Sequence, residues 1–176
     1  MLRRKRLRGG CFAATPTDPY HPRGTLFGQM QKASCVAACC RMLLFDYVPD
    51  VGEDLSFSES SLRNALQTTD QGTSASLIEK VMRAYGLTLS YRYRRDLTIA
   101  QLQATTAAYP AIAIVKTPDD LGVHALLIDD VNAARVLIRD PLPVCEGSAY
   151  ALPLPVFLSA WLDPKTGRGK AVIVLE

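Results

Sequence analysis

The stretch GQMQKASCVAACCRMLL, residues 28–44, changes from polar to apolar at Cys35. The alanines and leucines that follow are good helix formers or core residues, which predicts a helix over about Ser34–Tyr47 with Ser34 as its N-cap. A thiol at a helix N-terminus lies beside unpaired backbone N–H groups and the positive end of the helix dipole, and both favour the thiolate. Gln29 places an amide six residues ahead of this thiol.

The chain has 176 residues, 48% hydrophobic and 21% charged, a composition that fits one compact domain. Its net charge of +3 is unevenly distributed, because five basic residues give the first ten positions +5 and leave −2 for the remainder. We therefore expect residues 1–24 to be a basic, flexible N-terminal tail or arm and residues 25–176 to be a single domain. No other basic or aromatic motif indicates nucleic-acid binding, so none is expected.

Neither a secretory signal nor a membrane span is visible in the sequence. The cysteines are odd in number, include an adjacent pair and fit neither a disulfide framework nor a zinc site; they are Cys11, Cys35, Cys39, Cys40 and Cys145. Free thiols in a reducing compartment fit better. We expect a cytoplasmic protein, or one exported without a signal peptide, that needs no cofactor or metal.

The predicted elements are helices first and strands later. Helices are expected over residues 58–67, 74–85 and 98–109, with a half-buried strand over 87–94. Ser76 and Glu79 have the spacing of a capping box for the second of these helices. Beyond Pro110 the β-branched runs are residues 111–116, 123–131, 135–140 and 171–176, with a helix near 155–162 before the last. This order predicts an α+β fold, and the sequence has no glycine-rich phosphate loop.

Only two histidines are available as a general base. His21 lies among turn-forming residues in DPYHPRG, whereas His124 lies on the predicted strand VHALLIDD and shares a face with Leu126. With the hairpin turn centred near Ala133, Asp140 falls opposite Leu126, so His124 is its diagonal neighbour. A carboxylate in that position can accept the imidazole N–H and stabilise the protonated ring.

These residues make a coherent set if the fold brings Cys35 to His124. Cys35 would be the nucleophile, His124 the base and Asp140 its orienter. The Gln29 amide, together with the Cys35 backbone N–H, could donate hydrogen bonds to an oxyanion.

The segments that carry this set resemble the C39 branch of papain-like cysteine proteases, over about Gln29 to Pro141. The resemblance is carried by Q-x₅-C at 29–35 with the following A-A-C-C-R-M, then GTSASLIEKVMRAYGL, G-V-H-A and I-R-D-P. It implies a papain-like fold, N-terminal helices packed on a C-terminal antiparallel sheet. It also implies a bacterial cysteine peptidase that cuts leader peptides after a double glycine, with Cys35, His124, Asp140 and Gln29 in the roles above. The chain departs from the family at Val36, where glycine is frequent, and in the lack of a transporter segment, so we expect a stand-alone domain.

Other interpretations remain open for individual residues. Cys35 could be a small buried hydrophobe, and His124 a satisfied core histidine. Asp129 and Asp130 are alternative carboxylates, and Gln31 is an alternative to Gln29. Cys39 and Cys40 fit helix packing, although Cys39 lies one turn beyond Cys35 and could modulate it, and Cys145 has no assigned partner.

LRGG at residues 7–10 ends in a double glycine, so cleavage of the chain in cis after Gly10 is possible by length, although a flexible basic tail explains the motif as well. The first expectation for function is hydrolysis of a peptide bond in or after a small-residue segment. A glutamine deamidase or transglutaminase-like acyl transferase, acting as an effector or toxin, would use the same three residues. A third possibility is a C39-like module that docks peptides without turnover.

Overall fold

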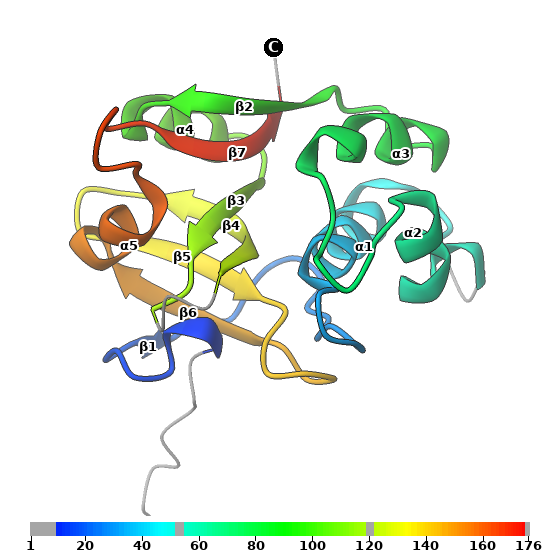
Figure 1. The fold of residues 1–176 in the computed structure, drawn as a ribbon, viewed down its shortest axis with the longest axis horizontal. Coiled ribbons are helices and arrows are strands. Elements are labelled where there is room, and N and C mark those ends of the chain that lie inside the picture. Colours follow the sequence, from blue (N-terminus) through cyan, green and yellow to red (C-terminus); the bar gives the residue numbers. More distant parts are fainter. Residues whose placement is uncertain (1–9, 52–54, 119–121, 175–176) are drawn as a thin grey trace, which may run out of the picture.

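The structure is a computed structural model that describes residues 10–51, 55–118 and 122–174 (Figure 1). Within these ranges the α-helices are α1 Cys35–Tyr47, α2 Glu59–Ala65, α3 Ile78–Ala84, α4 Ile99–Thr106 and α5 Leu154–Trp161. Short 3₁₀ turns are η1 Gly10–Phe12, η2 Leu55–Phe57 and η3 Ala75–Leu77. The strands are β1 Asp18–Pro19, β2 Tyr91–Leu97, β3 Ala111–Lys116, β4 Val123–Val131, β5 Arg135–Asp140, β6 Ser148–Pro153 and β7 Gly169–Val174.

The strands form one antiparallel sheet in the order β1-β6-β5-β4-β3-β7-β2. Its central strands are buried on both faces, as the consecutive apolar residues of β4 require. Ala125 and Leu127 face the core made with α1, α2 and α3, while Leu126 and Ile128 face a second core closed by α5 and Phe12. Figure 1 shows α1, α2 and α3 together on one side and α5 on the other. The predicted α+β fold is confirmed.

The elements that hold or adjoin the predicted site residues have the predicted bounds, to within one residue. The strands expected over 111–116, 123–131 and 135–140 are present as β3, β4 and β5, and the helix expected from Ser34 begins at Cys35. Thr98 and Gln101 form a complete capping box at the start of α4. None of the helices in the described ranges is both long and apolar enough to span a bilayer.

The second helix starts differently from the prediction. Residues 75–77 form η3, and α3 begins at Ile78 with no side-chain cap, so the capping box at Ser76 and Glu79 is wrong. The Ser76 hydroxyl is instead 2.7 Å from that of Ser74, and the Glu79 carboxylate pairs with Arg83 and Arg92. The strand expected over 87–94 is shifted to Tyr91–Leu97, because Gly86 turns the chain at a φ of +88° and a further turn precedes the strand.

Residues 10–24 differ from the expected flexible arm, because the structure describes them packed against the sheet. Phe12 is 2% exposed within the second core, and β1 pairs with β6 through Asp18↔Ala151 and Pro19↔Tyr150. An apolar anchor and a strand pairing therefore hold this segment. Residues 1–9, which carry the basic cluster, lie outside the described residues.

Candidate active site

Cys35 is the first residue of α1, and the packing of this helix brings it to β4. The Cys39 sulfur, one turn further along α1, lies 3.6 Å from the carbonyl oxygen of Ala125. Residues four apart share a helix face, so Cys35 lies one turn before Cys39 on this face. It therefore comes close to the start of β4, where His124 precedes Ala125. The thiol of Cys35 lies beside the His124 imidazole, and a side-chain hydrogen bond between the two groups contributes to the pKa shift of each.

A β-bulge places His124 and Asp140 on the same face of the sheet. Near the turn Val131 pairs with Val136 and Asp130 with Leu137, but beyond Asp129 the register shifts to Ile128↔Ile138 and Leu127↔Arg139. Continued by one residue, this register sets Asp140 opposite Leu126 and diagonal to His124. Without the extra residue, Asp140 would fall opposite Leu127 and point to the other face.

The Asp140 carboxylate is fully buried and accepts four hydrogen bonds. His124 Nε2 lies 2.7 Å from Oδ1, which also accepts the backbone N–H of Leu142 at 2.9 Å. Oδ2 accepts the backbone N–H of Cys11 at 2.8 Å and the hydroxyl of Tyr150 at 2.7 Å. Because His124 uses Nε2 for this carboxylate, Nδ1 is the ring nitrogen left to face Cys35.

The electrostatics of the three groups favour an ion pair. Burial alone lowers the pKa of His124, but hydrogen bonds to Asp140 and Cys35 outweigh it and raise this pKa to about 10. Burial raises the pKa of the Cys35 thiol, and the hydrogen bond and charge of His124 more than offset this, so the net shift is downward. The pKa of Asp140 is also lowered, since its hydrogen bond to His124 outweighs burial. The arrangement therefore stabilises a thiolate at Cys35, an imidazolium at His124 and a carboxylate at Asp140, side by side.

Gln29 is buried beside the loop that follows Asp140. Its backbone N–H donates to the carbonyl of Pro141 and its carbonyl accepts the N–H of Cys145, both at 2.9 Å. The side-chain Nε2 donates one hydrogen to the carbonyl of Gln31 at 2.9 Å, which leaves a second N–H. Gln29 Oε1 has no partner among the described residues. Gln31, the alternative amide, has an exposed side chain.

Two contacts from α2 support the loop before Cys35. Glu59 Oε2 accepts the backbone N–H of Met30 at 2.7 Å, and Glu59 is 5% exposed. The Arg63 guanidinium contacts the Ser34 hydroxyl, so Ser34 precedes the helix as expected but its side chain makes no capping bond. Sequence patterns gave no sign of these contacts, because residues 59 and 63 meet the loop only in the folded chain.

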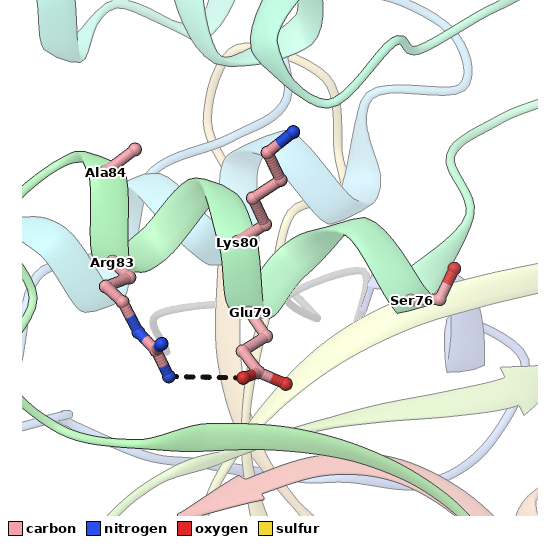
Figure 2. A pocket seen from close by; sticks show the side chains of 5 residues that line it. All are labelled: Ser76, Glu79, Lys80, Arg83 and Ala84. Atoms are coloured by element: carbon pink, nitrogen blue, oxygen red, sulfur yellow. Dashed lines mark hydrogen bonds and ion pairs between the residues drawn. The ribbon is translucent and has the colours of Figure 1, made fainter.

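The alternative residues lie elsewhere. Asp129 is bound by Arg139 on the opposite face of the sheet, and Asp130 and the exposed His21 line a pocket of about 650 Å³ there. Cys39 and Cys40 are fully buried and burial raises the pKa of each, whereas Cys145 is exposed. All five cysteines are free. A second pocket, of about 390 Å³, lies over η3 and α3 beside the Glu79–Arg83 pair and includes none of the residues above (Figure 2).

Cys11, His124 and Asp140 are the one group of possible metal ligands among the described residues. Their nearest ligand atoms lie within 4.8 Å of one another. However, each Asp140 oxygen already accepts two hydrogen bonds, so the cluster is organised as a hydrogen-bond network. No sequence pattern connects Cys11 or Tyr150 with this site.

The model of the family described as "Peptidase C39 family" matches residues 25–161, so the chain belongs to the C39 peptidase family. No curated protein matches the chain.

Solved peptidase domains share the fold. The peptidase domain of Streptococcus ComA, a bifunctional ABC transporter of a quorum-sensing pathway, is 21% identical with a TM-score of 0.62, over 86% of this chain and 98% of that one. A double glycine motif protease from an AMS/PCAT transporter, in complex with the leader peptide, is 16% identical with a TM-score of 0.58, over 92% and 100%. The peptidase domain of Streptococcus mutans ComA is 21% identical with a TM-score of 0.56, over 86% and 98%.

Proposed function

We propose that this protein is a cysteine peptidase that hydrolyses a peptide bond with Cys35, His124, Asp140 and Gln29. The observation that carries the proposal is the hydrogen bond between His124 and Asp140 beside the Cys35 thiol, which lies at the start of a helix in a member of the C39 family. The opposite pKa shifts of the thiol and the imidazole support a nucleophile ready for attack.

The reaction proceeds through an acyl-enzyme. The Cys35 thiolate attacks the scissile carbonyl carbon, and the resulting oxyanion accepts hydrogen bonds from the Cys35 backbone N–H and the free N–H of Gln29. The His124 imidazolium gives its proton to the leaving nitrogen, the C–N bond breaks and an amine leaves. His124 then takes a proton from water, whose oxygen attacks the thioester and releases the acid and the Cys35 thiolate. Asp140 holds the ring in place and stabilises its charged form.

A peptide segment with small residues at the cut is the substrate class that we propose. One similar structure is a double glycine motif protease that binds its leader peptide. Three exposed large apolar side chains among the described residues also lie close in the sequence to the proposed site residues. Met30 follows Gln29, Val123 precedes His124, and Val144 lies in the loop after Asp140. In this proposal these side chains contribute apolar contacts to a bound peptide.

Cleavage of the chain after its own Gly10 belongs to the same proposal as a secondary reaction. The Gly10–Cys11 amide donates to Asp140, so cis cleavage requires this segment to leave Asp140 and reach Cys35. A separate peptide is therefore the primary substrate. Mass analysis of the purified protein would distinguish chains that begin at Met1 from those that begin at Cys11. A bacterial origin and a cytoplasmic location are also part of the proposal, the latter supported by five free thiols.

The decisive experiment combines thiol labelling with product analysis. We expect iodoacetamide to label Cys35 at pH 6 far faster than the other thiols, and double-glycine peptides to be cut by the wild-type chain and not by Cys35→Ala. Cys145→Ser, which changes an exposed thiol, is the matched control and should cut normally. Equal labelling of all accessible thiols would contradict the proposal. A gain of one dalton without scission would indicate a deamidase, and peptide binding retained by Cys35→Ala with unchanged biological activity would indicate a docking module.

A further inference from the structure

Three of the four hydrogen bonds to the Asp140 carboxylate come from groups that the reaction itself does not use. Oδ1 is held by His124 and by the adjoining backbone at Leu142, whereas Oδ2 is held by the Tyr150 hydroxyl and the Cys11 N–H. Tyr150 comes from β6, and Cys11 lies well ahead of residues 25–161, which match the family. We propose that Tyr150 and the Gly10–Cys11 segment are positioning elements that fix Asp140 against His124, an inference that rests on the proposed peptidase function.

Tyr150 reaches Asp140 from the neighbouring strand. In the β5–β6 pair, Ile138 is opposite Tyr150 and Asp140 is opposite Ser148, so Tyr150 is the diagonal neighbour of Asp140 on the same face. The ring is 2% exposed within the second core, which leaves the hydroxyl little freedom of direction. Burial and the Asp140 charge raise the pKa of Tyr150, so its hydroxyl remains a donor over the neutral range.

The Gly10–Cys11 segment closes the other side of the carboxylate. Gly10 has a φ of +50°, and a Cβ at this position would lie 2.0 Å from Asp140 Oδ2 and 2.9 Å from the Ser148 hydroxyl oxygen. Only glycine permits this approach of the backbone, which puts the next N–H on Oδ2. Phe12, buried directly behind it, anchors the segment in the core. The Cys11 sulfur lies within 4.8 Å of a His124 ring nitrogen and an Asp140 oxygen.

This arrangement has a specific electrostatic effect. Donors on Oδ2 favour the ionised carboxylate in a buried position, and an ionised Asp140 in turn favours the imidazolium of His124. The titratable groups that face Asp140 are His124 from β4, Tyr150 from β6 and the Cys11 thiol from η1. Arg139 precedes Asp140 in the chain but points to the opposite face, where Asp46 and Asp129 bind it. Loss of a donor on Oδ2 should therefore weaken the ion pair at Cys35.

Tyr150→Phe tests the inference with a matched control. Tyr91→Phe removes another buried hydroxyl, which donates to the carbonyl of Pro110 at 2.9 Å on a strand far along the sheet. The measurement is the rate of Cys35 alkylation against pH, read at Cys35 by peptide mass mapping. Tyr150→Phe should slow alkylation at pH 6 roughly 10-fold and move the acid limb up by about one pH unit, since a hydrogen bond to a charged group is lost. Tyr91→Phe should keep the wild-type profile.

Gly10→Ala tests the segment in the same way. Gly167→Ala is its control, because Gly167 has a similar φ of +62° but no atom within 4 Å of an added Cβ. Both variants carry the cost of an alanine at positive φ, whereas only Gly10→Ala displaces the segment or Asp140. We expect Gly10→Ala to shift the alkylation profile in the direction of Tyr150→Phe and Gly167→Ala to leave it unchanged.

Peptide hydrolysis, measured in parallel, separates this inference from the proposed function. A wild-type chain that alkylates Cys35 rapidly yet cuts no peptide would contradict the peptidase, while the shift between Tyr150→Phe and Tyr91→Phe would still support positioning. Identical alkylation profiles for Tyr150→Phe, Tyr91→Phe and the wild type would overturn the positioning role even if the wild type is an active peptidase. Loss of kcat/KM in Tyr150→Phe with an unshifted profile would also overturn it, because that pattern indicates a general structural effect.

Discussion

Arg139 and Asp140 are consecutive residues of β5, both buried, and their side chains point to opposite faces of the sheet. Arg139 lies between two carboxylates, with Nη1 2.6 Å from Asp46 and Nη2 2.7 Å from Asp129, and Nη1 also donates to the carbonyl of Thr25. Asp140 lies on the other face with His124 as its only ionic partner among the described residues. On each face one aspartate also accepts a tyrosine hydroxyl, Asp129 from Tyr20 and Asp140 from Tyr150.

The two faces both bury charged groups, and they differ in the cation that pairs with the aspartates. The guanidinium of Arg139 keeps its proton at every accessible pH. Its contacts with Asp46, Asp129 and Thr25 can therefore only hold β5, β4, α1 and the chain before α1 together. The imidazole of His124 can lose and regain a proton, and it also contacts a thiol. The Arg139 face is therefore expected to govern stability, and the Asp140 face to govern chemistry.

His124→Ala should produce the largest effect, on the Asp140 face. Hydrolysis should fall roughly 10⁴-fold or more, because both the thiolate partner and the proton donor are lost. The kcat/KM for a cleaved peptide and the rate of Cys35 alkylation at pH 6 should fall together. His21→Ala, a change of an exposed imidazole on the other side, should leave both rates unaltered. Full activity of His124→Ala would remove the basis for assigning different roles to the two faces.

Arg139→Met should produce the largest effect on the opposite face. Removing the cation leaves Asp46 and Asp129 without their shared partner in a site where Arg139 is 1% exposed, so the free energy of unfolding should fall by about 3–5 kcal/mol. Urea denaturation measures this change. The control is Arg135→Met, which alters an exposed arginine of the same strand and should stay within about 0.5 kcal/mol of the wild type. Cys35 in the folded fraction should still alkylate rapidly; slow alkylation there would mean that the cluster also acts on the chemistry.

The sequence supported the assignment of the Asp140 face only in part. Gln29 and Cys35 were recognisable because they lie close together in the chain, and His124 because it stands on an otherwise apolar strand. The register was predicted correctly at Asp140, but through a turn centred near Ala133. In the structure Asn132 and Arg135 close a tighter turn, and the bulge at Asp129 restores the offset. Bulges leave little trace in a single sequence, since they depend on cross-strand partners.

The remaining contacts come from segments with weak patterns. SAYALP in β6 has no β-branched residue and ends in proline, so Tyr150 did not stand out. Gly10 and Cys11 lie in a glycine-, proline- and threonine-rich segment whose fixed position depends on burial of Phe12 against distant strands. Such long-range contacts are invisible to local propensity. The Arg139 cluster was missed for the same reason, because Asp46 and Asp129 meet only in the folded chain.

The pH dependence of hydrolysis is a further test of the Asp140 face, with a smaller expected effect. Leaving-group protonation needs the imidazolium, whose pKa is raised to about 10 because Asp140 and Cys35 outweigh burial. Hydrolysis should therefore persist through neutral pH and fall about tenfold per unit as the pH rises beyond about 10. In Asp140→Asn the protonated ring loses its anionic partner, so the pKa of His124 falls and this limb should move to lower pH. A limb unchanged by Asp140→Asn would contradict the link between the two residues.

Tyr20→Phe should have the smallest effect and provides the closest test, because it is the counterpart of Tyr150→Phe on the other face. The Tyr20 hydroxyl donates to Asp129 at 3.1 Å, and that carboxylate keeps several hydrogen bonds from Arg139 when the hydroxyl is removed. The free energy of unfolding should fall by about 1 kcal/mol or less, as for a single replaceable hydrogen bond. The alkylation profile of Cys35 should not move, since Asp129 does not contact His124. A shift in that profile equal to the shift of Tyr150→Phe would show that the two faces are electrostatically coupled through β5, and that the separation of stability from chemistry is wrong.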